Sequence, residues 1–266
     1  MKYDLKDTTF IIPVRIDSMI RLENLLLTLE NLESNFYTNI KIVEAAYYNN
    51  GILKQLINPD ITIDFFEDKD PVFHRTKHLN SISKNVNTYI TGIWDSDVII
   101  ESSQIIDAIK NLREKKCDFA YPYNGQFFDT SEIFRNHYLL YKDIDFLKKN
   151  ASKMELLYSS VKEGDSVGGA FLISTMKYKM SGLENENLYG WGLNDGERYH
   201  RWLIMNYCLY RSNGPLFHLT HPRDINGKMR SEYHYYKSWD EVHSILNSTE
   251  KELKKNFKKN KKQFIN

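Results

Sequence analysis

The segment Ile90-Thr-Gly-Ile-Trp-Asp-Ser-Asp-Val-Ile-Ile100 is the strongest indication of the fold, because it places an acidic triplet at the end of a buried apolar run. The residues before it, from His74 to Ile90, carry Leu79, Ile82 and Val86 at intervals of three and four, which predicts one apolar face of a helix. A helix that leads directly into a buried strand is typical of a βαβ unit and a mostly parallel sheet. Ligands bind such sheets outside the carboxyl ends of the strands.

The N-terminal part of the chain shows the same alternation. Thr8 to Arg15 is a β-branched, apolar run, and Ser18 to Leu32 has apolar residues at helical spacing. Two further apolar runs, Ile40 to Tyr47 and Ile61 to Phe66, predict successive strands of one sheet. The polar residues expected at the carboxyl ends of these strands are Arg15, Glu44 and Asp97.

From residue 118 onward the pattern is less regular. Phe119 to Tyr123 predicts a strand, Ser131 to about Val161 a long helix, and Gly168 to Ser174 another strand. We therefore expect an α/β fold with a Rossmann-like mixed, mostly parallel sheet flanked by helices. Residues 1–248 would form this single domain, and residues 249–266 a Lys-rich C-terminal helix or tail.

Composition limits the partners and the compartment. The 266 residues are 41% hydrophobic and carry 36 basic against 35 acidic side chains, so we expect no nucleic-acid partner, because a dedicated binder needs a net basic face. Two cysteines without CxxC spacing, together with the lack of a long apolar window, predict a cytoplasmic protein. The Lys-rich tail reads as solvated; peripheral contact with an anionic membrane is the alternative, through Leu253, Phe257 and Phe264.

The acidic triplet suits metal and sugar binding. Asp95 and Asp97 are separated by one residue and so point to opposite sides of an extended chain. One carboxylate can then bind a cation while the other faces a sugar or ribose, and hard oxygen ligands suit Mn²⁺ or Mg²⁺ on a diphosphate. The pattern is short and also occurs by chance, but the apolar runs on both sides fix it to a strand end.

Two histidines follow another apolar run. His218 and His221 come after Gly214-Pro-Leu-Phe217 and can present both imidazoles to one ion. Nitrogen beside carboxylate oxygen favours Mn²⁺ over Mg²⁺. The alternative interpretation is two ordinary loop histidines.

A glycine- and tryptophan-containing loop precedes an amphipathic helix. In Tyr189-Gly-Trp-Gly-Leu-Asn-Asp-Gly-Glu197 the glycines let a ligand approach the backbone closely, and Trp191 can stack on a sugar face. Asn194 as an N-cap and Glu197 three residues later predict a helix that begins near Asp195. Asp195 would then be a general base in the first turn. Acidic residues are also common in first turns for stability alone.

Six motifs occur in the order seen in β-1,4-galactosyltransferases, and the chain resembles a bacterial relative of that family over roughly residues 8 to 225. The chondroitin-polymerase and polypeptide GalNAc-transferase groups are similar, and all share the GT-A fold. The motifs are Ile11-Ile-Pro-Val-Arg15, Phe73-His-Arg-Thr-Lys-His-Leu-Asn80, Asp95-Ser-Asp97, Gly168-Gly169, Tyr189-Gly-Trp-Gly192 with Asn194-Asp195, and His218-Leu-Thr-His221.

The resemblance implies a role for each matching residue. Asp195 would be the catalytic base, and Asp97 and His221, together with His218, the metal ligands. The donor nucleotide would contact Pro13, Arg15, Glu44, Arg75, Asp95 and Trp191, and the acceptor Gly168, Gly169, Tyr189, Trp191 and Asn194. His218 stands where the galactosyltransferases have methionine, and Asn194 replaces an acid, so donor and acceptor identity stay open.

The sequence therefore predicts an inverting, metal-dependent glycosyltransferase. It would move a hexose or N-acetylhexosamine, with galactose or N-acetylgalactosamine favoured, from a UDP-sugar to a glycan or lipid-linked saccharide, in polysaccharide biosynthesis. Residues 222–231 could close over the donor or form an ordinary surface loop. A non-catalytic glycan- or nucleotide-binding protein with this fold, or a sugar nucleotidyltransferase, are the alternatives.

Overall fold

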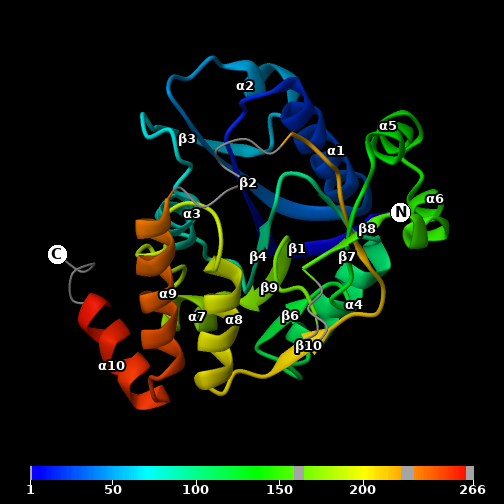
Figure 1. The fold of residues 1–266 in the computed structure, drawn as a ribbon. Helices are drawn as coiled ribbons and strands as arrows, with labels where there is room; N and C mark the ends of the chain where they lie inside the picture. The colour runs from blue at the N-terminus through cyan, green and yellow to red at the C-terminus, as the bar shows by residue number, and fades with distance from the viewer. Residues whose placement is uncertain (1, 159–164, 223–230, 262–266) are drawn as a thin grey trace.

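A mixed seven-stranded sheet forms the centre of the molecule (Figure 1). The structure is a computed structural model that describes residues 2–158, 165–222 and 231–261, with side chains of the last stretch described as far as residue 255. Across the sheet the strands are β10 (Leu209–Arg211), β6 (Phe119–Tyr121), β9 (Ala170–Ser174), β4 (Ile90–Trp94), β1 (Tyr3–Val14), β2 (Phe36–Ala46) and β3 (Thr62–Glu67). Only β9 runs antiparallel to its neighbours, so the predicted mostly parallel sheet is confirmed.

A smaller sheet and a set of helices complete the fold. The second sheet has the order β5 (Val98–Ile99), β11 (Leu216–His218), β7 (Phe127–Asp129) and β8 (Glu155–Leu157). The helices of the described residues are α1 (Met19–Asn35), α2 (Ile52–Leu56), α3 (Arg75–Ser83), α4 (Ser102–Arg113), α5 (Glu132–Tyr141), α6 (Ile144–Lys149), the 3₁₀ turn η1 (Ala151–Lys153), α7 (Thr175–Met180), α8 (Asn194–Ile204), α9 (Glu232–Leu246) and α10 (Glu250–Lys261).

The N-terminal alternation of strands and helices agrees with the sequence. Every residue of β1 from Thr8 to Val14 is buried, as expected for a central strand covered on both faces. Ser18 caps α1, since its hydroxyl oxygen accepts from the backbone N–H of Arg21 at 3.3 Å. The parallel strands β1, β2 and β4 therefore end at one edge of the sheet, where a ligand site is expected.

Two predicted helices are wrong in extent. The helix expected over 74–90 ends at Ser83, and Val86 is buried outside it because the chain must extend into β4. The long helix expected from Ser131 is broken after Tyr141, where Lys142 adopts a left-handed φ of 54° and Asp143 caps a new helix. β8 then follows where a helix was expected.

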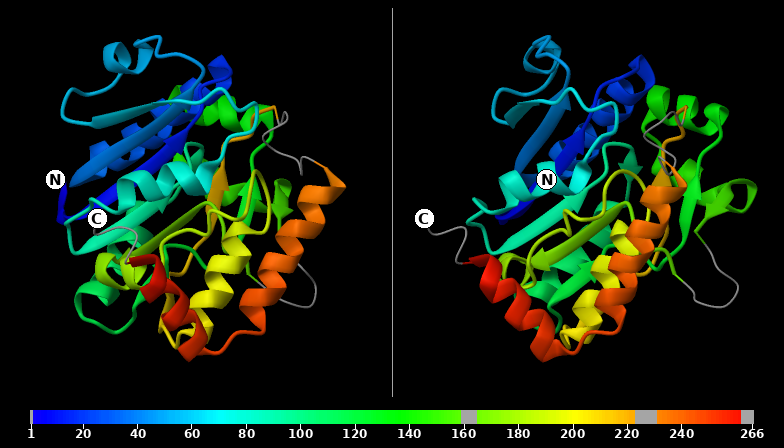
Figure 2. Two further views of the ribbon diagram at one scale, coloured as in Figure 1. Left: turned by 90° about the vertical axis from the view of Figure 1, so that its left-hand side faces the viewer. Right: turned by 60° about the vertical axis from the view of Figure 1, so that its left-hand side comes forward.

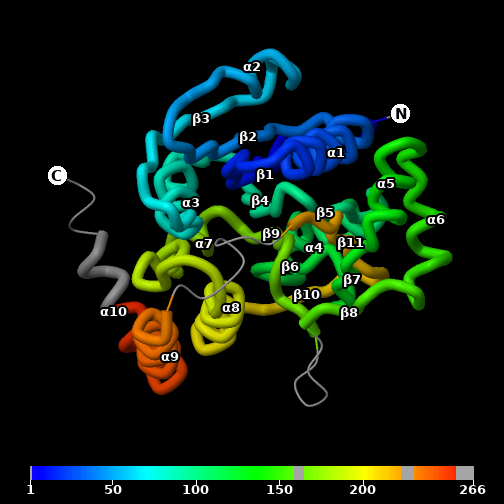
Figure 3. Tube along the Cα trace, turned by 45° about the horizontal axis from the view of Figure 1, so that its top comes forward, coloured from blue at the N-terminus to red at the C-terminus, as the bar shows by residue number. Residues whose placement is uncertain are grey.

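The C-terminal helices pack against the rest of the molecule beside helix α8. In both views of Figure 2 and in the tube of Figure 3, α9 lies beside α8, which the contacts between the two helices support. Leu253 on α10 is buried and belongs to the main hydrophobic core, so this face of the helix is packed. No helix of the described residues has the length and apolar character needed to cross a bilayer. Phe257 and Phe264 lie outside the described side chains.

Candidate active site

Strand pairing brings Asp97 and the two histidines together. Asp97 lies between β4 of the large sheet and β5 of the small one. Because β5 pairs antiparallel with β11, Val98 stands opposite His218, and the backbone N–H of Leu219 donates to the carbonyl of Asp97 at 2.7 Å. Residues more than a hundred positions apart in sequence therefore meet through backbone hydrogen bonds.

The three side chains form a compact donor set. His221 Nε2 lies 3.1 Å and His218 Nε2 3.6 Å from Asp97 Oδ2. All three ligand atoms lie within 4.8 Å of one another, and this is the metal-competent cluster among the described residues. One carboxylate and two imidazoles that converge on a common point suit a divalent metal ion.

Hydrogen bonds on the far side of each imidazole fix which nitrogen faces the cluster. Asp129 Oδ1 lies 2.8 Å from His218 Nδ1, and the carbonyl of Pro222 lies 2.9 Å from His221 Nδ1. Both Nδ1 atoms can thus donate, which leaves both Nε2 lone pairs for a cation. The residues present therefore fit a divalent metal. Sequence reasoning missed Asp129, which ends the short strand β7 beside His218 in β11.

The charges in the cluster reinforce one another. Burial alone would raise the pKa of Asp97, but the imidazoles of His218 and His221 hold this pKa well below its ordinary value. Burial would lower the pKa of His218, but the carboxylates of Asp97 and Asp129 raise it to about 9. The site therefore holds an ionised carboxylate in a buried position.

Helix α1 supports the cluster from behind. The Asn24 amide donates to the carbonyl of Leu219 at 2.8 Å, and the Thr28 hydroxyl to that of Ser96 at 3.1 Å. Both side chains are fully buried. Each satisfies a carbonyl next to a metal-site residue, so α1 holds the two halves of the site at a fixed spacing.

Asp95 faces the opposite side of the triplet. Its carboxylate pairs with Arg75 at 2.6 Å, and its backbone N–H donates to the carbonyl of Gly169 at 2.8 Å. Burial, opposed by Arg75 and reinforced by the negative charges of Asp97 and Asp195, raises the pKa of Asp95. The three carboxylates therefore share one electrostatic environment, in which Arg75 is the positively charged partner of Asp95.

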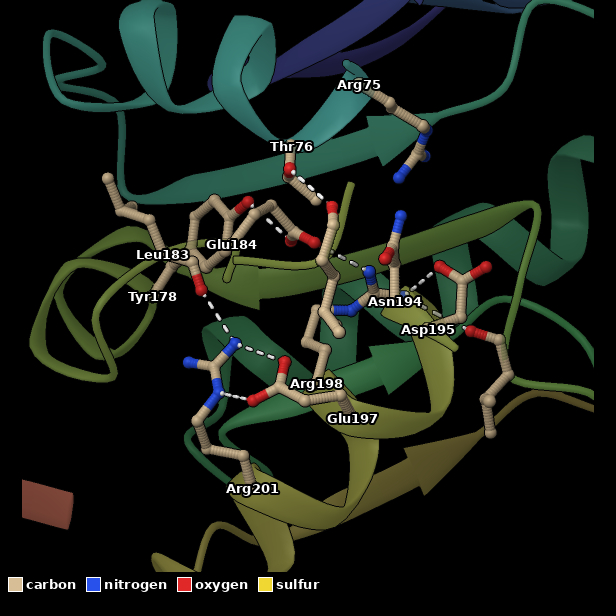
Figure 4. A network of polar contacts seen from close by, with 12 residues as sticks. Arg75, Thr76, Tyr178, Leu183, Glu184, Asn194, Asp195, Glu197, Arg198 and Arg201 are labelled. Carbon is tan, nitrogen blue, oxygen red and sulfur yellow. Dashed lines mark hydrogen bonds and ion pairs between the residues drawn. The ribbon is translucent and has the colours of Figure 1, made fainter. Parts of the chain in front are cut away.

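Asp195 lies in the first turn of α8, held by a buried arginine (Figure 4). Arg198 Nη2 lies 2.8 Å from Asp195 Oδ1, and the arginine side chain is 1% exposed while the aspartate side chain is 40% exposed. A Cβ atom on Gly168 would lie 3.1 Å from Asp195 Oδ2. Arg198 thus fixes Oδ1 of Asp195, and Oδ2 lies beside Gly168, where the absence of a side chain leaves room.

Arg198 belongs to a buried polar network that reaches the next turn of α8 (Figure 4). Arg198 Nη1 lies 3.1 Å from Glu184 Oε2, and the Tyr178 hydroxyl donates to Glu184 Oε1 at 2.8 Å. One turn along, Arg201 pairs with Glu197 at 2.7 Å. Glu197 therefore has a structural role. The expected capping box is wrong, because Leu193, in a left-handed conformation, and not Asn194, caps the helix.

The expected acceptor residues lie in two segments, one at Gly168 beside Asp195 and one in the loop that precedes Asp195. Gly169 has a φ of 76°, and a Cβ there would lie 2.7 Å from Phe127, so only glycine fits. Trp191 is 41% exposed and open to a ligand. Asn194 is buried with its amide 3.3 Å from the carbonyl of Gly190. The Tyr189 hydroxyl donates to Asp70 at 2.5 Å, so its ring is held in place.

Three of the expected donor residues lie near the ends of β1 and β2. Pro13 is buried within β1 opposite Val43, and Glu44 is buried at the end of β2, where burial raises its pKa. Arg15 donates to the carbonyls of Ala45 and Asp70 and pairs with Asp68 at 2.7 Å. The guanidinium thus fixes the segment after β3. The expected covering loop falls on residues 223–230, outside the described part of the chain.

No protein-family model matches the sequence, and no curated protein matches it significantly. Three solved structures are among those similar to this one. They are Staphylococcus aureus TarS residues 1–349 (TM-score 0.58, 12% identity, 95% of this chain and 68% of that chain), Mycobacterium tuberculosis glucosyl-3-phosphoglycerate synthase (0.51, 10%, 90% and 76%), and the catalytic domain of Drosophila β1,4-galactosyltransferase 7 (0.50, 12%, 87% and 79%). The second was solved with Mn²⁺, UDP and phosphoglyceric acid, the third with xylobiose. The chain therefore has the GT-A fold.

Proposed function

We propose that this protein is a metal-dependent, inverting glycosyltransferase that moves a hexose or N-acetylhexosamine, with galactose or N-acetylgalactosamine favoured, from a UDP-sugar to a hydroxyl of a glycan or lipid-linked saccharide. The observation that carries the proposal is the convergence of Asp97, His218 and His221. Asp95, in the same acidic triplet as Asp97, lies close enough to Asp195 for the two charges to interact. The similar structures with UDP, Mn²⁺ and a sugar acceptor support it.

Asp97, His218 and His221 would hold the cation, and a cation bound there supplies positive charge that neutralises the departing diphosphate. Arg75 stands on the other side of Asp95 and would face the donor. Pro13, Arg15 and Glu44 would form the nucleotide side of the site. Trp191 would stack on the sugars, since its ring is exposed at the start of the loop that leads to Asp195.

Asp195 would take the proton from the attacking acceptor hydroxyl. Its Oδ1 is occupied by Arg198, so Oδ2 is the atom assigned to this step. Oδ2 faces the space above Gly168, where an acceptor hydroxyl can reach it. The hydroxyl oxygen would then attack the anomeric carbon from the face opposite the departing UDP, which inverts the configuration.

The experiment that tests the proposal has two parts. A thermal-shift screen of UDP-Gal, UDP-GalNAc, UDP-Glc and UDP-GlcNAc with and without Mn²⁺ should show a metal-dependent rise in melting temperature, because a ligand of the native state stabilises it by mass action. Release of UDP in the presence of a saccharide acceptor should follow for the donor that binds. Binding of a UDP-sugar without release of UDP in the presence of any acceptor would favour the non-catalytic alternative.

A further inference from the structure

A cavity of about 420 Å³ lies next to the site described above and shares Tyr189 with it, between the 186–189 segment and helix α9. This volume is within the range of roughly 300–1,000 Å³ typical of small-ligand pockets. Figures 1 and 3 show α9 running beside α8. The cavity is lined by Glu186, Asn187, Tyr189, His234, Lys237 and Ser238.

The lining combines aromatic rings with groups that donate and accept hydrogen bonds. The rings of Tyr189 and His234 lie 5.3 Å apart at 38°. The carboxylate of Glu186 accepts hydrogen bonds and the ammonium of Lys237 donates them. The amide of Asn187 and the hydroxyl of Ser238 can do both. Sugar rings present the matching surfaces, with apolar C–H faces and hydroxyls that are donors and acceptors. A phosphate or polyanion would need clustered positive charge, whereas here Glu186 opposes Lys237.

The walls are held in place without a ligand. The Tyr189 hydroxyl donates to Asp70, and the Asn80 amide donates to Glu186 Oε1 at 2.8 Å. The amides of Asn185 and Asn187 both donate to Glu241 on α9, at 2.8 and 3.0 Å. A pocket with fixed walls loses less entropy when it binds a ligand.

One wall of the cavity is continuous with the active-site loop. Tyr189 is two residues from Trp191, and its ring contacts His74 at a centroid distance of 5.3 Å. His74 directly precedes Arg75, the partner of Asp95. The cavity therefore shares Tyr189 with the loop that leads to Asp195.

We propose that this cavity is a saccharide subsite that binds a pyranose residue of the acceptor other than the residue that is glycosylated. Its role in acceptor binding rests on the proposed function, but the binding of a neutral sugar does not. The subsite would make the enzyme prefer oligosaccharide acceptors to monosaccharides of the same terminal sugar.

Saturation-transfer NMR tests the cavity without any need for catalysis. The probes are xylobiose, lactose, cellobiose and N,N′-diacetylchitobiose, each added to the full chain in the absence of nucleotide. Asn187→Trp places a ring in the cavity, and Asn247→Trp is the matched control, since both asparagines are exposed and the second lies at the far end of α9. Lys237→Ala removes one polar contact without adding bulk.

Transfer from the protein to at least one disaccharide is expected for the wild type and Asn247→Trp, with loss in Asn187→Trp and a weaker signal in Lys237→Ala. No transfer to any probe with the wild type, or equal transfer with both tryptophan variants, would overturn the proposal. The thermal shift with UDP and Mn²⁺ on the same samples separates the two claims. If the wild type shows no such shift, the proposed function fails, while the sugar-binding result still decides whether the cavity binds a saccharide.

Discussion

The carboxylates of Asp97 and Asp195 belong to one site but are held in different ways. Asp97 has a side chain that is 9% exposed and faces two imidazoles, whereas Asp195 is 40% exposed and held from below by one arginine. Different environments give like groups different tasks. A buried carboxylate that faces two imidazoles suits a cation, and an exposed carboxylate with one oxygen away from the arginine suits proton transfer. The difference predicts distinct failures when each side chain, or its support, is altered.

The largest effect is expected from Asp97→Ala. The substitution removes the carboxylate that both imidazoles face, so metal-dependent UDP binding should be lost. Calorimetric titration of UDP with and without Mn²⁺ measures this, and chelation of the wild type should reproduce it. Unchanged Mn²⁺-dependent binding in the variant would remove Asp97 from the metal site.

Asp195→Asn should lower kcat by about 10²- to 10⁴-fold, because a general base typically contributes that much. UDP and Mn²⁺ should bind as in the wild type, since the amide does not touch the histidine cluster. Steady-state kinetics combined with the same titration would separate chemistry from binding. A variant as fast as the wild type would show that another group accepts the proton.

Arg198→Lys tests the support of Asp195. A lysine cannot hold Glu184 and Asp195 together as the forked guanidinium does, and a displaced carboxylate can cost about 10²-fold in rate. Arg201→Lys is the matched control, because Arg201 is equally buried but pairs with Glu197. Both variants should lose stability in urea unfolding, and only Arg198→Lys should lose kcat. Equal kcat values would make Arg198 a purely structural residue.

The smallest of these effects is expected from Asp129→Asn. The change weakens the hydrogen bond that orients His218 and should lower metal affinity by roughly 10- to 100-fold. Saturating Mn²⁺ should restore activity, which distinguishes this variant from Asp97→Ala. Activity measured across a Mn²⁺ series gives the shift, and a reduced rate that Mn²⁺ does not restore would contradict the orienting role.

Sequence reasoning reached the parts of the fold that local pattern determines. Apolar runs predicted β1 to β4, and helical apolar spacing predicted α1, because a segment that packs against the core carries an apolar pattern in its own sequence. It failed over residues 131–158, where Lys142 and Asp143 end one helix and begin another. A helical apolar spacing continues across such a break, so periodicity alone does not reveal it.

The candidate site divides in the same way. Asp95, Asp97, His218 and His221 each follow an apolar run, so their position at strand ends was predictable. Asp129 and Arg198 were not found, because their roles depend on strand register and on the inward face of α8. The roles assigned to the expected site residues remain predictions until the variants are measured.

The pairing of β5 with β11 also determines when, during synthesis, the cluster of Asp97, His218 and His221 can form. Ribosomes release the chain from its N-terminus, so Asp97 emerges long before either imidazole that must face it. The nascent chain cannot assemble the cation site until residues 216–221 have left the exit tunnel and joined the small sheet. The order of translation therefore prevents the nascent chain from holding a cation through these three side chains before His221 has emerged.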